Sequence, residues 1–175
     1  GNFSYTPSSG TTGATFPWTR PVVTGISNSA GSGTGNPSET LTNTTAAPIN
    51  VTYAYNVSAN GCSNIQNVVV AVNPIPTLTS TLTPPDICSG DAFNYSPSSF
   101  TGGVTFSWSR PVVAGISNPA GSGSGNVSEA LVNTTPNPVD VTYVYTLSAS
   151  GCTNSTTYSV VVTVNQVPSL TSSLT

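Results

Sequence analysis

One long phrase occurs twice in the sequence, and this repeat constrains the fold more than any other feature. Residues 15–27 read TFPWTRPVVTGIS, and residues 105–117, ninety positions later, read TFSWSRPVVAGIS. Other phrases recur in the same order, such as VTYAY at residues 51–55 and VTYVY at residues 141–145. A repeat with a fixed long period is the signature of similar structural units arranged in tandem.

The repeat divides the chain into three segments. Residues 1–76 form a first unit without its N-terminal strand, residues 77–168 form a complete second unit, and residues 169–175 match the first strand of a third. We therefore expect the sequence to be a window on a longer array. The joint at residues 73–76, Asn-Pro-Ile-Pro, contains two prolines and no glycine, which predicts a short and stiff connection.

Within each unit the apolar residues alternate with polar ones, as in half-buried strands. Val51, Tyr53 and Tyr55 share one face of such a strand, and no segment has the period of a helix. About seven short strands in roughly ninety residues, with a tryptophan on an early strand, indicate an all-β fold of tandem Ig-like β-sandwiches. The expected aromatic core residues are Phe16, Trp18, Tyr53, Tyr55, Phe106, Trp108, Tyr143 and Tyr145.

Charged residues make up only 4% of the chain, and its two cations, Arg20 and Arg110, occupy the same place in the repeat. Arg20 has the strand parity of Trp18 and therefore faces the core. Glu39, nineteen positions later, shares a face with Leu41 and faces the core for the same reason. A lone inward charge is costly, whereas a bidentate pair satisfies both groups. We predict structural ion pairs between Arg20 and Glu39 and between Arg110 and Glu129. A ligand site for a sugar or a carboxylate is the alternative.

The three cysteines are consistent with one disulfide in each unit. Cys88 lies near the start of the second unit and Cys152 near its end, and Cys62 corresponds to Cys152. We predict a Cys88–Cys152 disulfide worth about 4 kcal/mol, with the partner of Cys62 outside the sequence. The chain has no histidine and no CxxC motif, which argues against zinc. A disulfide points to an oxidising, extracellular setting.

Several classes of function lack the residues that they need. Without histidine, and without a recurring close pair of acids, we expect no catalytic site, no enzyme activity and no cofactor. Two cations are too few to hold the phosphates of a nucleic acid. No apolar run is long enough for direct membrane insertion.

Three local features have both a functional and a structural interpretation. Asp86 and Asp91 are the only candidate calcium ligands near the joint, but both lie in good turn sequences, and we expect no metal. The glycine-rich stretches at residues 31–35 and 121–125 resemble a nucleotide loop without its lysine and helix, which favours a bulged hairpin or a flexible loop. Sequons such as Asn43-Thr-Thr are weak evidence for glycosylation in a chain this rich in Ser, Thr and Asn.

The spaced motifs of the second unit together resemble the PKD-like repeats of giant Bacteroidota cell-surface proteins, best known from SprB-type gliding-motility adhesins. They are CSG from Cys88, WSR at residues 108–110, GIS at residues 115–117, EAL at residues 129–131 and YVY at residues 143–145. The resemblance implies export by type IX secretion and a long filament on the outer cell surface, moved by the gliding machinery. The implied partners are neighbouring repeats of the same chain, with surface polysaccharide or other filament proteins as further candidates.

Three functions remain open from the sequence. The leading one is a structural stalk repeat of a surface adhesin. The second is a carbohydrate-binding module of a secreted multidomain protein, which needs outward aromatic rings; Phe100 and Tyr158 are the aromatic residues that depart from the core-facing pattern. The third is a self-assembling filament subunit that exchanges a strand between chains.

Overall fold

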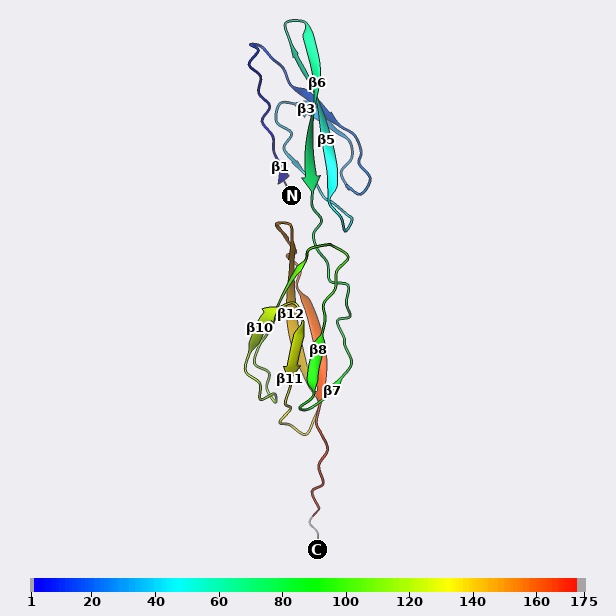
Figure 1. Ribbon diagram of the computed structural model, residues 1–175, viewed down its shortest axis with the longest axis vertical. Coiled ribbons are helices and arrows are strands. Elements are labelled where there is room, and N and C mark those ends of the chain that lie inside the picture. Colours follow the sequence, from blue (N-terminus) through cyan, green and yellow to red (C-terminus); the bar gives the residue numbers. More distant parts are fainter. Residues whose placement is uncertain (1, 173–175) are drawn as a thin grey trace. The chain divides into compact units, whose positions relative to one another are not determined.

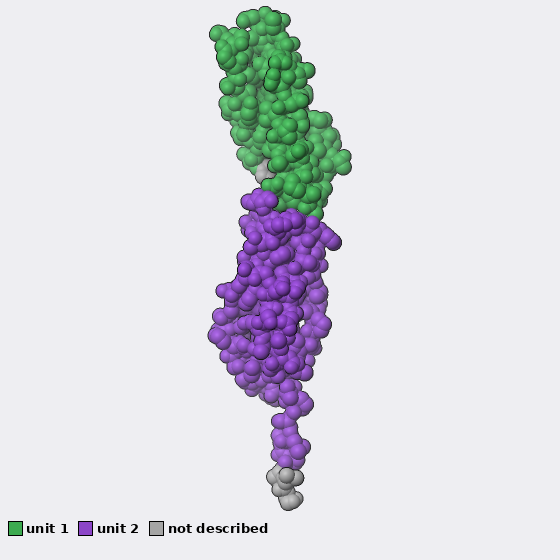
Figure 2. Space-filling view, in the orientation of Figure 1, with its two compact units in different colours: residues 1–75 green, residues 76–175 purple. Residues whose placement is uncertain are grey.

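The structure, a computed structural model, describes residues 2–172 and is all-β: no described residue lies in a helix. None of the described segments is therefore a helix that could cross a membrane. The chain divides into two compact units, Gly1–Ile75 and Pro76–Thr175, which are coloured separately in Figure 2. This boundary lies one residue from the one that the repeat predicts.

Unit 1 contains a larger and a smaller antiparallel sheet. The larger sheet has, in spatial order, β3 (Gly31–Thr34), β2 (Pro17–Arg20), β5 (Ile49–Ala59) and β6 (Cys62–Val72). The smaller sheet pairs β1 (Asn2–Phe3) with β4 (Glu39–Thr40). The Phe3 ring of the smaller sheet stacks on Tyr53 of the larger one, with centroids 4.8 Å apart. The two sheets thus face each other across the core as a β-sandwich.

Unit 2 repeats this arrangement with two further strands in its larger sheet. Its larger sheet has the order β10 (Gly121–Ser124), β9 (Thr105–Arg110), β12 (Val139–Ala149), β14 (Tyr158–Asn165) and β7 (Ile87–Cys88), and β13 (Cys152–Thr153) pairs with β12. Its smaller sheet pairs β8 (Ala92–Tyr95) with β11 (Val127–Ala130). The β7–β14 pair is parallel, and the other described ladders are antiparallel.

The core follows the predicted alternation. On β12, Val141, Tyr143, Tyr145 and Leu147 are fully buried, while the residues between them are not. Of the predicted aromatic core residues, the four tyrosines and Trp18 are buried. Phe16, Phe106 and Trp108 are partly buried and pack against the same clusters.

Each unit has a long hairpin, β5–β6 in unit 1 and β12 with the short β13 and then β14 in unit 2. The long strands β5, β6 and β12 are labelled in Figure 1. Asn60 and Gly61 connect β5 to β6 with positive φ angles of 51° and 80°, and Ser150 and Gly151 do the same in unit 2. Two successive residues with positive φ form the tight turn whose twist matches paired strands.

The segment at residues 77–82, which corresponds in the repeat to the predicted first strand at residues 169–175, forms no ladder, although it is hydrogen-bonded. Its backbone contacts two different neighbours, Ser98 through Thr79 and Val161 through Leu82, and therefore builds no continuous register with either. Residues 169–172, the described part of the predicted strand of a third repeat, also contain no strand; residues 173–175 lie outside the described residues.

Candidate functional site

The structure brings the two predicted charge pairs together. In unit 1, Nε of Arg20 donates to Oε2 of Glu39 at 2.9 Å and Nη2 donates to Oε1 at 3.0 Å. In unit 2, the corresponding distances between Arg110 and Glu129 are 3.0 and 3.2 Å. Each arginine is only 2% exposed. Both pairs have the fork geometry of a strong, charge-assisted contact.

The remaining arginine donors bind backbone carbonyls close to each pair. Nη2 of Arg20 donates to the carbonyl of Ser29 at 2.6 Å, and Nη1 donates to that of Pro21 at 3.3 Å. Arg110 makes the same two contacts in unit 2, to Pro119 and Pro111. A guanidinium used in this way by its own unit has little capacity to bind a ligand. This arrangement favours the structural interpretation over a sugar or carboxylate site.

A tyrosine completes each network, and the sequence interpretation missed this role by assigning the residue to the core alone. The hydroxyl of Tyr53 donates to Oε2 of Glu39 at 2.6 Å, and that of Tyr143 donates to Oε2 of Glu129 at 2.5 Å. The sequence contained a signal for this role. A tyrosine in place of phenylalanine at a fully buried strand position requires a hydrogen-bond partner for its hydroxyl.

The network keeps its carboxylates ionised. The hydrogen bond from Arg20 lowers the pKa of Glu39 and outweighs burial, which would raise it. For Glu129, burial raises the pKa, but hydrogen bonds from Arg110 and Tyr143 together outweigh it, so that the pKa is again below its usual value. Burial, reinforced by the bond to Glu129, raises the pKa of Tyr143, whose hydroxyl therefore stays protonated.

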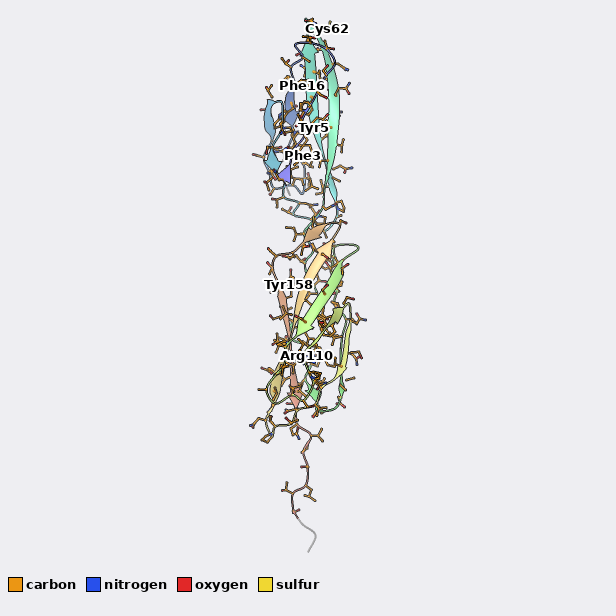
Figure 3. The ribbon with its side chains drawn as sticks, turned by 90° about the vertical axis from the view of Figure 1, so that its left-hand side faces the viewer. Phe3, Tyr5, Phe16, Cys62, Arg110 and Tyr158 are labelled. Atoms are coloured by element: carbon orange, nitrogen blue, oxygen red, sulfur yellow. The ribbon has the colours of Figure 1, made fainter. Side chains whose placement is uncertain are left out.

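Each network joins the two sheets of its sandwich. Glu129 lies on β11 of the smaller sheet, whereas Arg110 and Tyr143 lie on β9 and β12 of the larger sheet. Arg110 is labelled within unit 2 in Figure 3. In unit 1, Glu39 on β4 binds Arg20 on β2 and, as described, the tyrosine on β5. The site is thus a polar bridge across an otherwise apolar core.

The glycine-rich stretches are edge strands beside this bridge, and the expectation of a flexible loop is wrong. A Cβ on Gly121 would lie 3.1 Å from Oε1 of Glu129, and one on Gly123 would lie 2.9 Å from the Trp108 ring. Glycine at these two positions lets the strand lie close to the carboxylate and the indole. The indole N–H of Trp108 is buried and has no hydrogen-bond partner among the described residues.

The predicted disulfide between Cys88 and Cys152 is wrong, because these cysteines, like Cys62, are free. Cys88 on β7 lies beside Asn165 at one end of the large sheet, and Cys152 pairs with Ala149 at the other end. The two ends are separated by about ten residues of β12, or roughly 30 Å at the usual rise of a strand. A disulfide requires Cα atoms within about 7 Å. The cysteines of the described residues therefore give no support to the expected extracellular setting.

An asparagine in each unit holds a loop in place, which the sequence interpretation did not foresee. Nδ2 of Asn133 donates to the carbonyls of Asn137 and Val164, both at 2.8 Å, and its Oδ1 accepts from the Thr135 backbone. Asn43 makes the same contacts in unit 1. A side-chain amide bonded to two carbonyls is not free to carry a glycan, so the Asn43 sequon reflects this structural role.

The two aromatic residues considered for carbohydrate binding form no platform. Phe100 is 83% exposed, but Tyr158 packs against the core of unit 2, and its hydroxyl accepts a hydrogen bond from Asn154 at 3.1 Å.

The candidate calcium ligands, Asp86 and Asp91, belong to no cluster of metal-ligating side chains. The described residues contain no group of three or more acidic, cysteine or histidine side chains that could hold a metal ion.

Comparison with known proteins supports the fold family of unit 2. Residues 85–168 match the family described as PKD-like domain. No curated protein matches the chain. Among solved structures, an endo-fucoidan hydrolase from glycoside hydrolase family 107 aligns with 97% of this chain at 15% identity and a TM-score of 0.31, and the chain covers 24% of that structure. A likeness this distant carries no argument about function.

Proposed function

We propose that the chain is a stalk segment of a secreted, cell-surface filamentous adhesin, in which each unit is a spacer that resists extension. PKD-like domains are typically extracellular parts of multidomain proteins, and residues 85–168 match that family. The resemblance to SprB-type adhesins adds the finer points of the proposal. These are export by type IX secretion and a filament that serves surface attachment and gliding motility.

The observation that carries the proposal is the Arg–Glu–Tyr bridge between the two sheets of each sandwich. Separating the sheets would pull Glu129 away from both Arg110 and Tyr143. Breaking a fully buried ion pair costs about 3–5 kcal/mol. The Glu129 side chain is 23% exposed, so the cost here lies toward or below the lower end of that range. The same three residue types make the same bonds in unit 1. An internal cross-link that recurs in each unit suits a spacer that bears load.

The terminal strands of unit 2 support the same function. Its first strand, β7, and its last, β14, are parallel neighbours, and the backbone of Val161 also binds that of Leu82 ahead of β7. Tension applied to the two ends of the unit therefore pulls these strands along each other. Hydrogen bonds loaded in this direction must break together rather than one after another.

Stretching single molecules of the full chain tests the proposal. We expect two unfolding events, each releasing on the order of 25–35 nm, from about 70–95 residues at ~3.6 Å each. Tyr143→Phe, which removes one hydroxyl from the bridge, should lower the force of one event and leave the other unchanged. Val112→Ala is the matched control, because Val112 is 69% exposed. Equal forces for wild type and Tyr143→Phe would contradict the proposal.

A second experiment separates the spacer role from adhesion itself. Antibodies against unit 2 should label filaments on intact host cells. Deletion of both units in frame should shorten the filaments while cells still attach to a surface. Loss of attachment without a change in filament length would assign the adhesive contact to these units instead.

A further inference from the structure

The hairpin tip of unit 1 carries an asparagine followed by glycine, Asn60-Gly61, and no other asparagine of the sequence precedes a glycine. Unit 2 has Ser150-Gly151 at the same place in the repeat. Figure 3 labels Cys62, which follows Gly61 and begins β6, at the end of this hairpin. The two units therefore differ in chemistry at a tip that they share in structure.

The two tips have nearly the same backbone. The φ angle is 51° at Asn60 and 48° at Ser150, and it is 80° and 78° at the glycines that follow. Asparagine is common at this position of a tight turn, but the same turn forms with serine in unit 2. The side-chain amide of Asn60 is therefore not required to build the turn.

The amide groups at the tip of unit 1 are accessible to each other and to water. Asn60 and Gly61 are both exposed. In a two-residue turn the flanking residues pair across the ladder, here Ala59 with Cys62, and the amide nitrogen of the glycine lies outside it. By contrast, the side-chain amide of Asn133 is fixed by bonds to two carbonyls. The Gly61 nitrogen and the Asn60 side chain can thus approach each other.

The turn also permits the backbone geometry that this approach requires. Joining the Gly61 nitrogen to Cγ of Asn60 closes a five-membered ring, in which Cβ of Asn60 eclipses that nitrogen. This occurs at the ψ of about −120° that the first central residue of a type II′ turn has, where φ is about +60°. Asn60 already has a φ of 51°, so rotation of the peptide plane that joins it to Gly61 is sufficient. Type I′ and type II′ turns both close two-residue hairpins, so the strands stay paired during the rotation.

We propose that Asn60 is a site of spontaneous deamidation in the folded protein, with its own backbone as the nucleophile and water as the co-reactant. A base removes the proton of the Gly61 amide, and the nitrogen forms a bond to Cγ of Asn60. The bond from Cγ to the side-chain nitrogen breaks, and that nitrogen leaves as ammonia with the proton returned by the base. Water then opens the cyclic imide. Cleavage at Cγ gives aspartate, and cleavage at the backbone carbonyl carbon gives isoaspartate.

The modification changes the tip of unit 1 and not that of unit 2. Both products place a carboxylate beside the exposed Cys62, in a chain whose formal net charge is −3. Isoaspartate also adds a methylene group to the backbone between Ala59 and Cys62. Ser150 has no amide to lose, so the tip of unit 2 keeps its structure. This inference goes beyond the spacer function and does not depend on it.

Incubation of the full, folded chain in mildly alkaline buffer, with samples taken over time, tests the proposal. Peptides released by pepsin in acid, where the reaction is slow, are analysed by electron-transfer mass spectrometry, which separates isoaspartate from aspartate. Asn60 should be converted before any other asparagine, and faster as the pH rises. Asn60→Ser, which introduces the residue of unit 2, should leave the tip unchanged. A folded chain that keeps Asn60 intact while the same chain in urea is converted would overturn the proposal.

Two further variants separate the turn from the dipeptide sequence. Ser150→Asn builds the same pair of residues on a turn with nearly the same φ angles, and the introduced asparagine should be converted within a few-fold of the rate of Asn60. Ser155→Gly places a glycine after Asn154, whose side-chain amide is held by Pro76 and the Tyr158 hydroxyl, and Asn154 should react many-fold more slowly. An unreactive asparagine in Ser150→Asn, or an Asn154 in Ser155→Gly that reacts as fast as Asn60, would contradict the role of the turn.

Discussion

The hydroxyl of Tyr143 lies 2.5 Å from Oε2 of Glu129, the same oxygen that accepts a hydrogen bond from Nε of Arg110 at 3.0 Å. One carboxylate oxygen thereby connects two strands of the larger sheet to the smaller sheet. In unit 1, the equivalent contacts of Glu39 measure 2.6 and 2.9 Å. The bridge therefore recurs in both units with nearly the same geometry.

Removal of the guanidinium should destabilise unit 2 strongly. We expect Arg110→Ala to lower its free energy of unfolding by at most about 3–5 kcal/mol, because Glu129 would keep a charge without its partner but is 23% exposed to water. Urea unfolding followed by the fluorescence of Trp108, in a Trp18→Phe background, measures this unit alone. Replacing both Arg110 and Glu129 by leucine should cost less than the sum of the two single replacements. Additive losses would contradict a coupled pair.

The close approach of β10 to Trp108 predicts a second effect. Gly123→Ala would place a methyl group 2.9 Å from the indole ring, and the resulting overpacking should cost about 1–3 kcal/mol. Gly102→Ala is the matched control, because no atom lies within 4 Å of the added methyl group. The two variants are compared by urea unfolding. Equal stability would show that β10 moves aside freely.

The lowered pKa values of Glu39 and Glu129 predict the response to acid. Both pKa values lie below the ordinary 4.5, so the stability that the ionised carboxylates contribute is fully present above about pH 4.5. It is lost as the pH falls through the lowered pKa of the folded state. We expect the urea midpoint of wild type to fall in this range. Glu129→Gln should give a flatter profile for unit 2, and a steeper one would contradict the assignment.

Free cysteines predict that oxidation leaves each unit unchanged. A thiol reagent should titrate three groups per denatured chain purified without reductant, and Cys88→Ser and Cys152→Ser should each change the free energy of unfolding by no more than about 0.5 kcal/mol. Mass spectrometry gives the control. A monomer that loses two hydrogens on mild oxidation would show a bond between cysteines of one chain, contrary to the separation of Cys88 and Cys152.

Strand parity was sufficient to predict which side chains face the core. It did not predict how far apart two residues lie along the length of the sheet. Parity placed Arg20 beside Trp18 and made Glu39 a partner, and it predicted the alternation on β12. It could not locate Cys88, whose place depends on the path of the chain. Pro76 accepts a hydrogen bond from Asn154, at the end of the sheet where Cys152 lies. From there residues 76–82 lead along the sheet, and Cys88 lies at its opposite end.

The glycine-rich stretches show a second limit of the sequence. Glycine is common both in bulged hairpins and in flexible loops, and local preference alone therefore left both interpretations open at residues 121–125. The structure uses Gly121 and Gly123 for their lack of a side chain, because a carboxylate and an indole ring lie against the strand. Those neighbours lie on other strands, Glu129 on β11 of the smaller sheet and Trp108 on β9 of the larger one. Only the tertiary structure reveals the requirement.

The burial of both arginines also determines the electrostatic character of the exterior. Arg20 and Arg110 are the only lysine or arginine residues of the chain, so that no basic side chain reaches solvent to any extent. The outer surface consists mainly of hydroxyl and amide groups with a few carboxylates. Filaments built from such units would attract no polyanions and would repel one another weakly when side by side. In dilute salt, where Debye screening is weakest, this weak repulsion would extend furthest from the fibre.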